Sequence, residues 1–308
     1  MTGAVSKHVA VLKGGWSSER DVSLVSGALC ANALEDAGYR VSQIDVKQDL
    51  KALLNALEPR PDVVFNALHG RVGEDGTVQA VLNILEIPYT HSGLLASALA
   101  MNKPMAKMLF TAAGIPCPEG QVIDIGDLKK VTAITPPYVI KPLNEGSSVG
   151  VHIVRVGDNS LPVDDWNFGD KVLLERYIPG RELTVAVVDG NPLGVTELLP
   201  REGFYDYKAK YSEGETEHLC PAQIPADTEA KAKDYAVRAH NLLGCHGVTR
   251  ADFRYDDTES KCGCLYLLEI NTQPGMTPLS LVPEQAALHG QSFSELVTVM
   301  VEAATCDA

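Results

Sequence analysis

The sequence predicts a protein of mixed α/β and α+β class, with an N-terminal doubly wound parallel sheet. Over roughly the first ninety residues, short apolar strands alternate with helices, the order typical of a parallel sheet covered on both faces. Beyond that region strands dominate. Because 308 residues exceed the usual size of one hydrophobic core, we expect two or three domains. The change of pattern along the chain divides it into three, at residues 1–97, 98–183 and 184–308.

The N-terminal domain is predicted from its alternating apolar runs. We expect strands at residues 8–12, 41–46, 62–67 and 87–89, and helices at 49–57 and 77–85. Ser18 and Asp21 fit a capping box for the first helix, which Gly38 would end. Its apolar face is expected to carry four residues at helical spacing, Val22, Val25, Leu29 and Ala33.

Caps and β-rich runs predict the remaining elements. We expect strands at residues 138–141, 151–156, 172–177, 183–188 and 193–199, followed by a polar loop at 200–221. Helices are predicted to begin at the caps Asn102, Asp227 and Ser292, the last with Glu295 as a capping box. Gly114 and Gly244 would end the first two.

Two strands near the C-terminus, at residues 248–255 and 265–270, bring together the most informative side chains. If they form a hairpin that pairs Asp252 with Glu269, the same register places Arg250 opposite Asn271. Two adjacent carboxylates repel unless a cation lies between them, and an all-oxygen set suits Mg²⁺ or Mn²⁺. The alternative is a salt-bridge cluster on the surface.

Composition limits the classes of partner. The formal charge of −14 disfavours nucleic acid and anionic membranes. The N-terminal apolar run Val9–Leu12 is too short for a signal peptide or a membrane span, so we expect a cytoplasmic protein with reduced cysteines. Cys262 and Cys264, with Cys245 and His246, could form a metal site, but their spacing favours a plain hairpin turn.

Three segments are candidates for ligand contacts. The Gly/Ser-rich loop from Lys141 to Gly150 could fold over a nucleotide triphosphate or be a simple hairpin loop. The aromatic and basic residues 204–211 suggest a lid that excludes water. Glu19, after a Gly-Gly turn, suits a substrate ammonium group, although an acid in a first helical turn is also stabilised by the helix dipole.

The segment after the second hairpin strand offers groups for an acyl intermediate. The Gly275 N–H beside Arg250 would make an oxyanion hole. Ser280 and the Leu281 N–H could bind a carboxylate, although a serine there is also a common helix or turn cap.

Taken together, the chain closely resembles the D-alanine–D-alanine ligases of the ATP-grasp superfamily. The resemblance runs from His8 to about Val299 and keeps the family order of motifs. The motifs are GGWSSERDVSL, LHGRVGEDGT, MNK, IKPLNEGSSVG, FYDYKAKY, RADF and LLEINTQPGMTPLSLVPE. Each is weak by itself, whereas their ordered coincidence is specific.

The resemblance implies that a first D-alanine attacks the γ-phosphoryl group of ATP and that a second attacks the acyl phosphate. It implies that Glu19 binds the first ammonium and forms a triad with Ser147 and Tyr211, with His69 near the first substrate. The implied ATP contacts are Lys103, Lys141, Ser147, Ser148, Glu175 for adenine, Glu182 for ribose and Lys210 for the transferring phosphoryl group.

The same resemblance implies two Mg²⁺ (or Mn²⁺) ions held by Asp252, Glu269 and Asn271. Arg250 and Gly275 would stabilise the oxyanion, and Ser280 and Leu281 would bind the second substrate. Relatives that make D-alanyl-D-lactate tend to carry phenylalanine where this chain has Tyr211, which favours D-alanine. The alternatives are a D-alanyl-D-lactate or other ATP-grasp ligase, a carboxylase, or a non-catalytic nucleotide-binding protein. The family is commonly dimeric, so we expect a homodimer.

Overall fold

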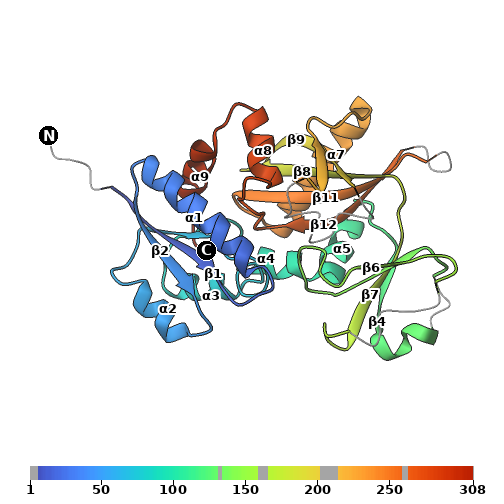
Figure 1. Cartoon of the computed structure of the whole chain (residues 1–308), viewed down its shortest axis with the longest axis horizontal. Coiled ribbons are helices and arrows are strands. Elements are labelled where there is room, and N and C mark those ends of the chain that lie inside the picture. Colours follow the sequence, from blue (N-terminus) through green and yellow to red (C-terminus); the bar gives the residue numbers. More distant parts are fainter. Residues whose placement is uncertain (1–5, 131–133, 159–165, 202–213, 259–262, 308) are drawn as a thin grey trace.

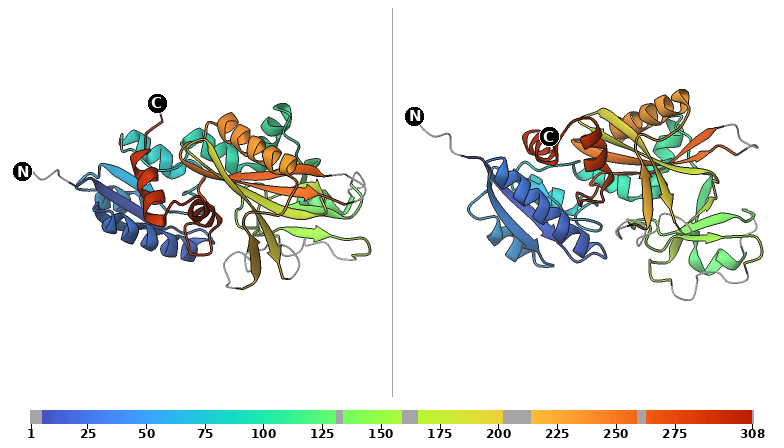
Figure 2. Two further views of the ribbon diagram at one scale, coloured as in Figure 1. Left: turned by 90° about the horizontal axis from the view of Figure 1, so that it is seen from above. Right: turned by 45° about the horizontal axis from the view of Figure 1, so that its top comes forward.

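The computed structural model describes residues 6–130, 134–158, 166–201, 214–258 and 263–307, which form three sheets with their covering helices (Figure 1). The parallel sheet and the four-stranded sheet lie at opposite ends of the molecule, with the five-stranded sheet between them (Figure 2). In this described part, no helix is long and apolar enough to cross a membrane.

The N-terminal sheet is parallel and doubly wound, as predicted. Its strands are β1 (His8–Gly14), β2 (Arg40–Val46) and β3 (Val63–Asn66), in the order β2-β1-β3. One face packs against α1 (Arg20–Asp36), and the other against α2 (Leu50–Ala56) and α3 (Thr77–Ile84). The expected strand at residues 87–89 is reduced to isolated bridges at Tyr89, which pairs with Val64 on one side and Thr305 on the other.

The five-stranded antiparallel sheet supports the candidate site. It has the order β10-β9-β8-β11-β12. Its strands are β8 (Arg181–Val188), β9 (Asn191–Pro200), β10 (Thr216–Leu219), β11 (Val248–Asp256) and β12 (Cys264–Asn271). One face buries α4 (Leu94–Met101), α5 (Lys103–Ala112) and α7 (Ala226–Leu243). The other face meets α8 (Leu281–Leu288), and α9 (Phe293–Glu302) fills the space toward α1.

The four-stranded antiparallel sheet has a small core of its own. Its strands, in the order β4-β7-β5-β6, are β4 (Gly120–Asp124), β5 (Tyr138–Lys141), β6 (His152–Val154) and β7 (Lys171–Arg176), with a short 3-10 helix, η1 (Ile125–Lys130). Its apolar centre is formed by Leu128, Ile140, Val154, Val172 and Leu174. The boundaries 97/98 and 183/184 stay predictions, while α4 and α5 pack within the core of the five-stranded sheet.

Several caps follow the sequence. Asn102 accepts a hydrogen bond from Met105 N at 3.2 Å, and Ser292 with Glu295 forms the complete capping box of α9. Gly38, Gly114 and Gly244 follow their helices with positive φ. The fold class and these helix ends are therefore confirmed.

The start of α1 was predicted wrongly. The N-cap is Glu19, whose side chain makes no cap bond, so the expected Ser18–Asp21 capping box is absent. Val25 is 49% exposed, and the buried face carries Ser23, Ser26 and Cys30 instead. Small residues are needed because α1 lies close to β1: a Cβ on Gly27 would lie 2.5 Å from Lys13 Cβ.

Other elements also differ from the expectation. The N-cap of α7 is Pro225, and Asp227 lies within the first turn. Residues 216–219, expected in a polar loop, form β10 and pair with β9. Helix α4 and strand β4 were not predicted. Strand β4 is mostly exposed, so it lacks the alternation of buried and polar residues that marks a strand.

We expect Gly180→Ala to destabilise the protein more than Gly190→Ala. Both glycines have left-handed φ, of 89° and 76°, so each substitution should cost about 1–2 kcal/mol. A Cβ at Gly180 would also lie 2.2 Å from the Tyr255 carbonyl oxygen, whereas a Cβ at Gly190 would meet nothing within 4 Å. Overpacking should add about 1–3 kcal/mol at Gly180, measurable by urea unfolding. Equal losses in the two variants would contradict this account.

Candidate active site

The predicted hairpin register is confirmed. Strands β11 and β12 pair with Asp252 opposite Glu269 and Arg250 opposite Asn271, and the register shifts only after Asp252. Because side chains alternate along a strand, these four groups share one face of the sheet. Two carboxylates, an amide and a guanidinium therefore meet on one patch.

Each acid of this patch faces a cation. Arg250 donates from Nε to Asp252 Oδ1 at 2.9 Å and from Nη2 to Oδ2 at 2.8 Å. Thr184 Oγ1 also donates to Asp252 Oδ1, at 2.7 Å. Lys103 Nζ lies 3.1 Å from Glu269 Oε2. Carboxylates this close require such counter-charges, and an oxygen-only donor set with Asn271 suits a hard divalent cation.

Histidine and cysteine do not extend the possible metal ligands. In the residues described, no three His, Cys, Asp or Glu side chains gather as a metal site. The alternative built on Cys264 and Cys245 has one exposed and one buried thiol, and Cys262 lies outside the described residues. The Asp252, Glu269 and Asn271 group is thus the best candidate for a cation.

Two adjoining clefts contain every predicted site residue that the structure describes. A cleft of about 800 Å³ and one of about 1560 Å³ share Lys103, Glu145 and Glu269 as a common wall. The smaller is lined by Glu19, His69, Ser147, Arg250, Asn271, Gly275, Ser280 and Leu281. The larger is lined by Lys141, Ser148, Glu175, Glu182 and Asp252. Tyr211 and Lys210 lie outside the described residues.

Glu19 is held between two glycine loops. Its carboxylate is buried and accepts a hydrogen bond from Ser147 Oγ. A Cβ on Gly70 or Gly146 would lie 2.8 or 3.0 Å from Glu19 Oε2, so both loops approach it at backbone distance. The next residues, Ser147 and Ser148, have φ of 48° and 59°, a conformation that non-glycine residues adopt at a cost. The loop predicted to cover a nucleotide is therefore tied to Glu19.

His69 lies in a buried polar network beside Glu19. Its Nδ1 is 3.3 Å from Glu74 Oε1, and its Nε2 is 3.3 Å from Ser26 Oγ. Burial lowers the pKa of His69, but Glu74, Glu19 and the Gln273 backbone together raise it above its ordinary value. Positive charge on this imidazole is therefore favoured. Glu74 was not predicted, although it lies in the same motif as His69.

A buried chain of charges lines the larger cleft. Lys141 Nζ lies 2.7 Å from Glu175 Oε2, and Lys107 Nζ donates to Oε1 of the same carboxylate. Burial raises the pKa of Glu175, but the two lysines lower it by more. The net pKa lies below its ordinary value, so the carboxylate stays ionised. Burial and repulsion from Lys141 lower the pKa of Lys107 to about 8. Lys107 was missed, although its place one helical turn after Lys103 could have indicated it.

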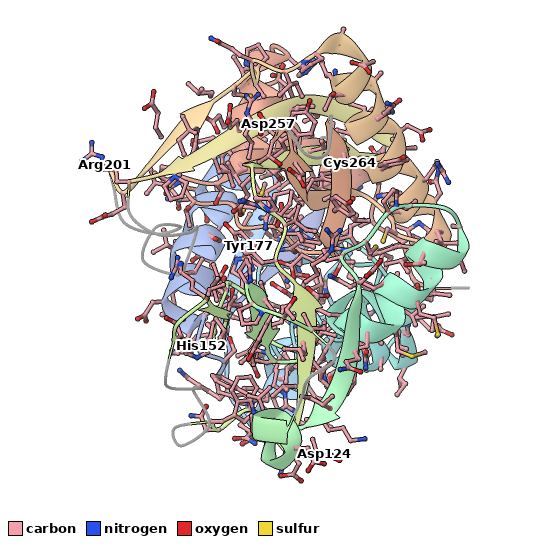
Figure 3. All side chains as sticks on the ribbon, turned by 90° about the vertical axis from the view of Figure 1, so that its right-hand side faces the viewer. Asp124, His152, Tyr177, Arg201, Asp257 and Cys264 are labelled. Carbon is pink, nitrogen blue, oxygen red and sulfur yellow. The ribbon has the colours of Figure 1, made fainter. Side chains whose placement is uncertain are left out.

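Glu182 also lines the larger cleft. Its Oε2 is 3.4 Å from Arg254 Nη1, and Arg254 also donates to the carbonyls of Ile178 and Gly180. The guanidinium is 5.9 Å from the centroid of the Tyr177 ring. Figure 3 shows Tyr177 between Asp257, which follows β11 of the five-stranded sheet, and His152 of the four-stranded sheet. The cleft therefore opens between the two antiparallel sheets.

Ser280 belongs to a tight turn that starts α8. Its Oγ accepts from Thr277 N at 2.9 Å, and a Cβ on Gly275 would lie 2.9 Å from this oxygen. Ser280 is the N-cap residue of α8, and Leu281 is the first helical residue. Helix N-termini have unbonded N–H groups, which favour an anion such as a carboxylate.

Comparison with known families decides what this site belongs to. The family profile "D-ala D-ala ligase C-terminus" matches residues 109–302, and "D-ala D-ala ligase N-terminus" matches residues 48–92. The chain belongs to the D-alanine–D-alanine ligase family.

Individual members of this family match over their whole length. The D-alanine–D-alanine ligase of Parvibaculum lavamentivorans is 57% identical, over 98% of this chain and 99% of its own. That of Paramagnetospirillum magneticum is 58% identical, over 98% and 100%. The crystal structure of the Bacillus anthracis ligase complexed with ATP is 31% identical, with a TM-score of 0.81 and 97% of both chains covered. The three-domain ATP-grasp architecture predicted for the chain is the fold of these ligases.

We expect the unfolding free energy of the wild type, relative to Lys107→Met, to rise between about pH 8 and pH 10. In this window the unfolded chain keeps a lysine proton that the folded chain has lost, since the pKa of Lys107 is lowered to about 8. Stability then increases with pH, by at most about 1.4 kcal/mol per unit. Urea unfolding at stepped pH measures this, with Lys231→Met on α7 as the surface control. A flat or falling difference would refute the assignment.

Proposed function

We propose that the protein joins two D-alanine molecules into D-alanyl-D-alanine with ATP, through an acyl phosphate, releasing ADP and phosphate. The observation that supports this best is the common wall of the two clefts. Lys103, Glu145 and Glu269 separate a cleft that contains Glu19 and His69 from one with buried lysines. A carboxylate substrate and a nucleotide triphosphate bound on the two sides would meet at this wall.

The smaller cleft would bind the first D-alanine. Glu19 would hold its ammonium group, and His69, whose positive charge is favoured, would lie near its carboxylate. Ser147, already bonded to Glu19, would link this site to the nucleotide loop. Tyr211 would complete the hydrogen-bonded triad and tie the lid over the site, which would exclude water from the acyl phosphate.

The larger cleft would bind ATP. Lys103 and Lys141 would contact its phosphates, together with the loop residues Ser147 and Ser148. Lys210 would reach the transferring phosphoryl group. Glu175 would accept from the adenine amino group, because a carboxylate held by two lysines still has free lone pairs. Glu182, near the mouth, would bind the ribose hydroxyls.

Asp252, Glu269 and Asn271 would hold two Mg²⁺ or Mn²⁺ ions. The donor set fits, because these three oxygen-bearing side chains meet on one face of the sheet. Its two carboxylates already attract positive charge, from Arg250 at Asp252 and from Lys103 at Glu269. When bound, such ions neutralise the charge of the phosphoryl groups. Asp252 would then need Arg250 less, and the guanidinium would be available to the reacting carbonyl.

The second half-reaction would take place beside α8. The Ser280 hydroxyl and the Leu281 N–H would bind the carboxylate of the second D-alanine. Its amine attacks the acyl phosphate, and Arg250 and the Gly275 N–H would stabilise the oxyanion of the tetrahedral intermediate. Collapse of that intermediate forms the amide bond and expels phosphate.

The setting of the reaction follows from the product and the charge of the chain. D-alanyl-D-alanine is a precursor of peptidoglycan, so we place the protein in the cytoplasm, where ATP is available. A net charge of −14 supports neither nucleic acid nor membrane as a partner. We further propose a homodimer, as is common in this family.

Product identification tests the proposed function. With ATP, Mg²⁺ and an equal mixture of D-alanine and D-lactate, we expect D-alanyl-D-alanine by mass spectrometry and matching release of phosphate. Release should require D-alanine and should cease with EDTA. D-alanyl-D-lactate as the main product would instead identify a depsipeptide ligase. Release that is independent of D-alanine would refute the proposal.

Arg250→Met should lower kcat by about 10²–10³-fold, the usual loss when one donor to a developing oxyanion is removed. Arg238→Met is a matched control, because Arg238 pairs with Asp234 on the surface of α7, away from both clefts. Phosphate release at saturating substrates provides the rates, and thermal unfolding checks that both variants fold. Comparable rates for the two variants would remove Arg250 from the mechanism.

A further inference from the structure

We propose that Gln273 is a positioning residue that fixes the first-substrate cleft against the cation ligands across two domains. This inference rests on the proposed function. Gln273 follows β12 and is 1% exposed.

The side-chain amide of Gln273 is bonded entirely to the N-terminal domain. Its Oε1 accepts from Asn66 Nδ2 at 2.7 Å, and its Nε2 donates to the Leu68 carbonyl. Asn66 is fully buried at the end of β3. Burying two amides is costly unless their hydrogen bonds are made, so loss of either partner leaves the other unsatisfied.

The segment that Gln273 holds is the loop that carries His69. Asn66 closes this loop: its Nδ2 donates to the Gly73 carbonyl at 3.0 Å, and its Oδ1 accepts from Leu68 N at 3.2 Å. Gly73 packs so tightly that a Cβ would lie 2.8 Å from the Leu68 carbonyl carbon. The loop is therefore compact, and Gln273 bonds to it at the Leu68 carbonyl.

The backbone of Gln273 connects the same loop to the cation ligands. Its N–H donates to Asn271 Oδ1 at 2.8 Å. A second hydrogen bond between the segment after β12 and the N-terminal domain is donated by Met276 N to Ser26 Oγ, at 3.3 Å. Ser26 Oγ is also 3.3 Å from His69 Nε2. Gln273 thus joins the loop that carries His69, near which the first substrate would bind, to Asn271, which would hold a cation beside the phosphoryl groups.

Removing the amide should affect the two substrates differently. The loop would shift relative to β12, and a small misplacement of reacting groups can cost about 10²-fold in rate. His69 and Gly70, which adjoins Glu19, move with the loop, so D-alanine binding should weaken. Lys141, Glu175 and Glu182 line the larger cleft, whose described lining does not include Gln273, so ATP binding should remain.

Gln273→Met tests this, because methionine keeps the length of the side chain and lacks the amide. We expect the KM for D-alanine at the first site to rise about tenfold or more and kcat to fall, while the KM for ATP changes by less than about twofold. Gln79→Met is the matched control. Gln79 is equally buried and donates to the Gly73 carbonyl at 2.8 Å, but from within the N-terminal domain.

A double-mutant cycle with Asn66→Ala separates positioning from general loss of stability. If the two amides act through their hydrogen bond, the double variant should raise the KM for D-alanine by less than the product of the single effects. A readout free of metal and ATP is the NMR signal of the His69 ring, which should move in Gln273→Met and stay in place in Gln79→Met.

Equal effects of Gln273→Met and Gln79→Met on KM, or independent effects in the cycle, would overturn the inference. So would an unchanged His69 signal in a folded Gln273→Met variant. Each of these outcomes leaves the wild type making D-alanyl-D-alanine, which separates them from failure of the proposed function. That failure would appear in the wild type itself, as absence of the dipeptide.

Discussion

The pairing of Asp252 with Glu269 across β11 and β12 is the constraint on which the rest of the site depends. Two carboxylates held this close repel each other, and positive charge must be brought to them. Arg250 supplies it from the same strand, and Lys103 supplies it from the first turn of α5. Ala106 and Phe110 pack α5 into the core of the five-stranded sheet, and this packing brings Lys103 to Glu269.

Lys103 carries this constraint outward to the rest of the site. Its ammonium donates to the Glu145 carbonyl at 2.6 Å, and its N–H donates to the Leu143 carbonyl at 3.1 Å. These contacts hold the Gly/Ser-rich loop against β12, and Ser147 of that loop donates to Glu19. A continuous set of contacts therefore runs from the carboxylate pair on the five-stranded sheet to Glu19 at the start of α1.

The sequence predicted those features that depend on local pattern. The hairpin register follows from side-chain alternation, and the caps at Asn102 and Ser292 follow from residue type. The buried face of α1 was predicted only in part: Val22 and Ala33 are buried, but Val25 is exposed and small residues face β1. Lys107 and Gln273 were missed because their partners are distant in sequence: Glu175 is 68 residues from Lys107, and Asn66 is 207 from Gln273. No local pattern marks Gln273, whereas the place of Lys107 one helical turn after Lys103 could have indicated it.

The shared wall of the two clefts has a thermodynamic consequence. A ligand that changes the charge or orientation of Lys103 or Glu269 from one side alters the surface offered to a ligand on the other. Any such influence must be reciprocal, because the free energy that couples two equilibria has one value whichever molecule arrives first. If an amino acid and a nucleotide bind as proposed, each should therefore change the affinity of the protein for the other by the same factor. This property arises from the three residues that line both clefts.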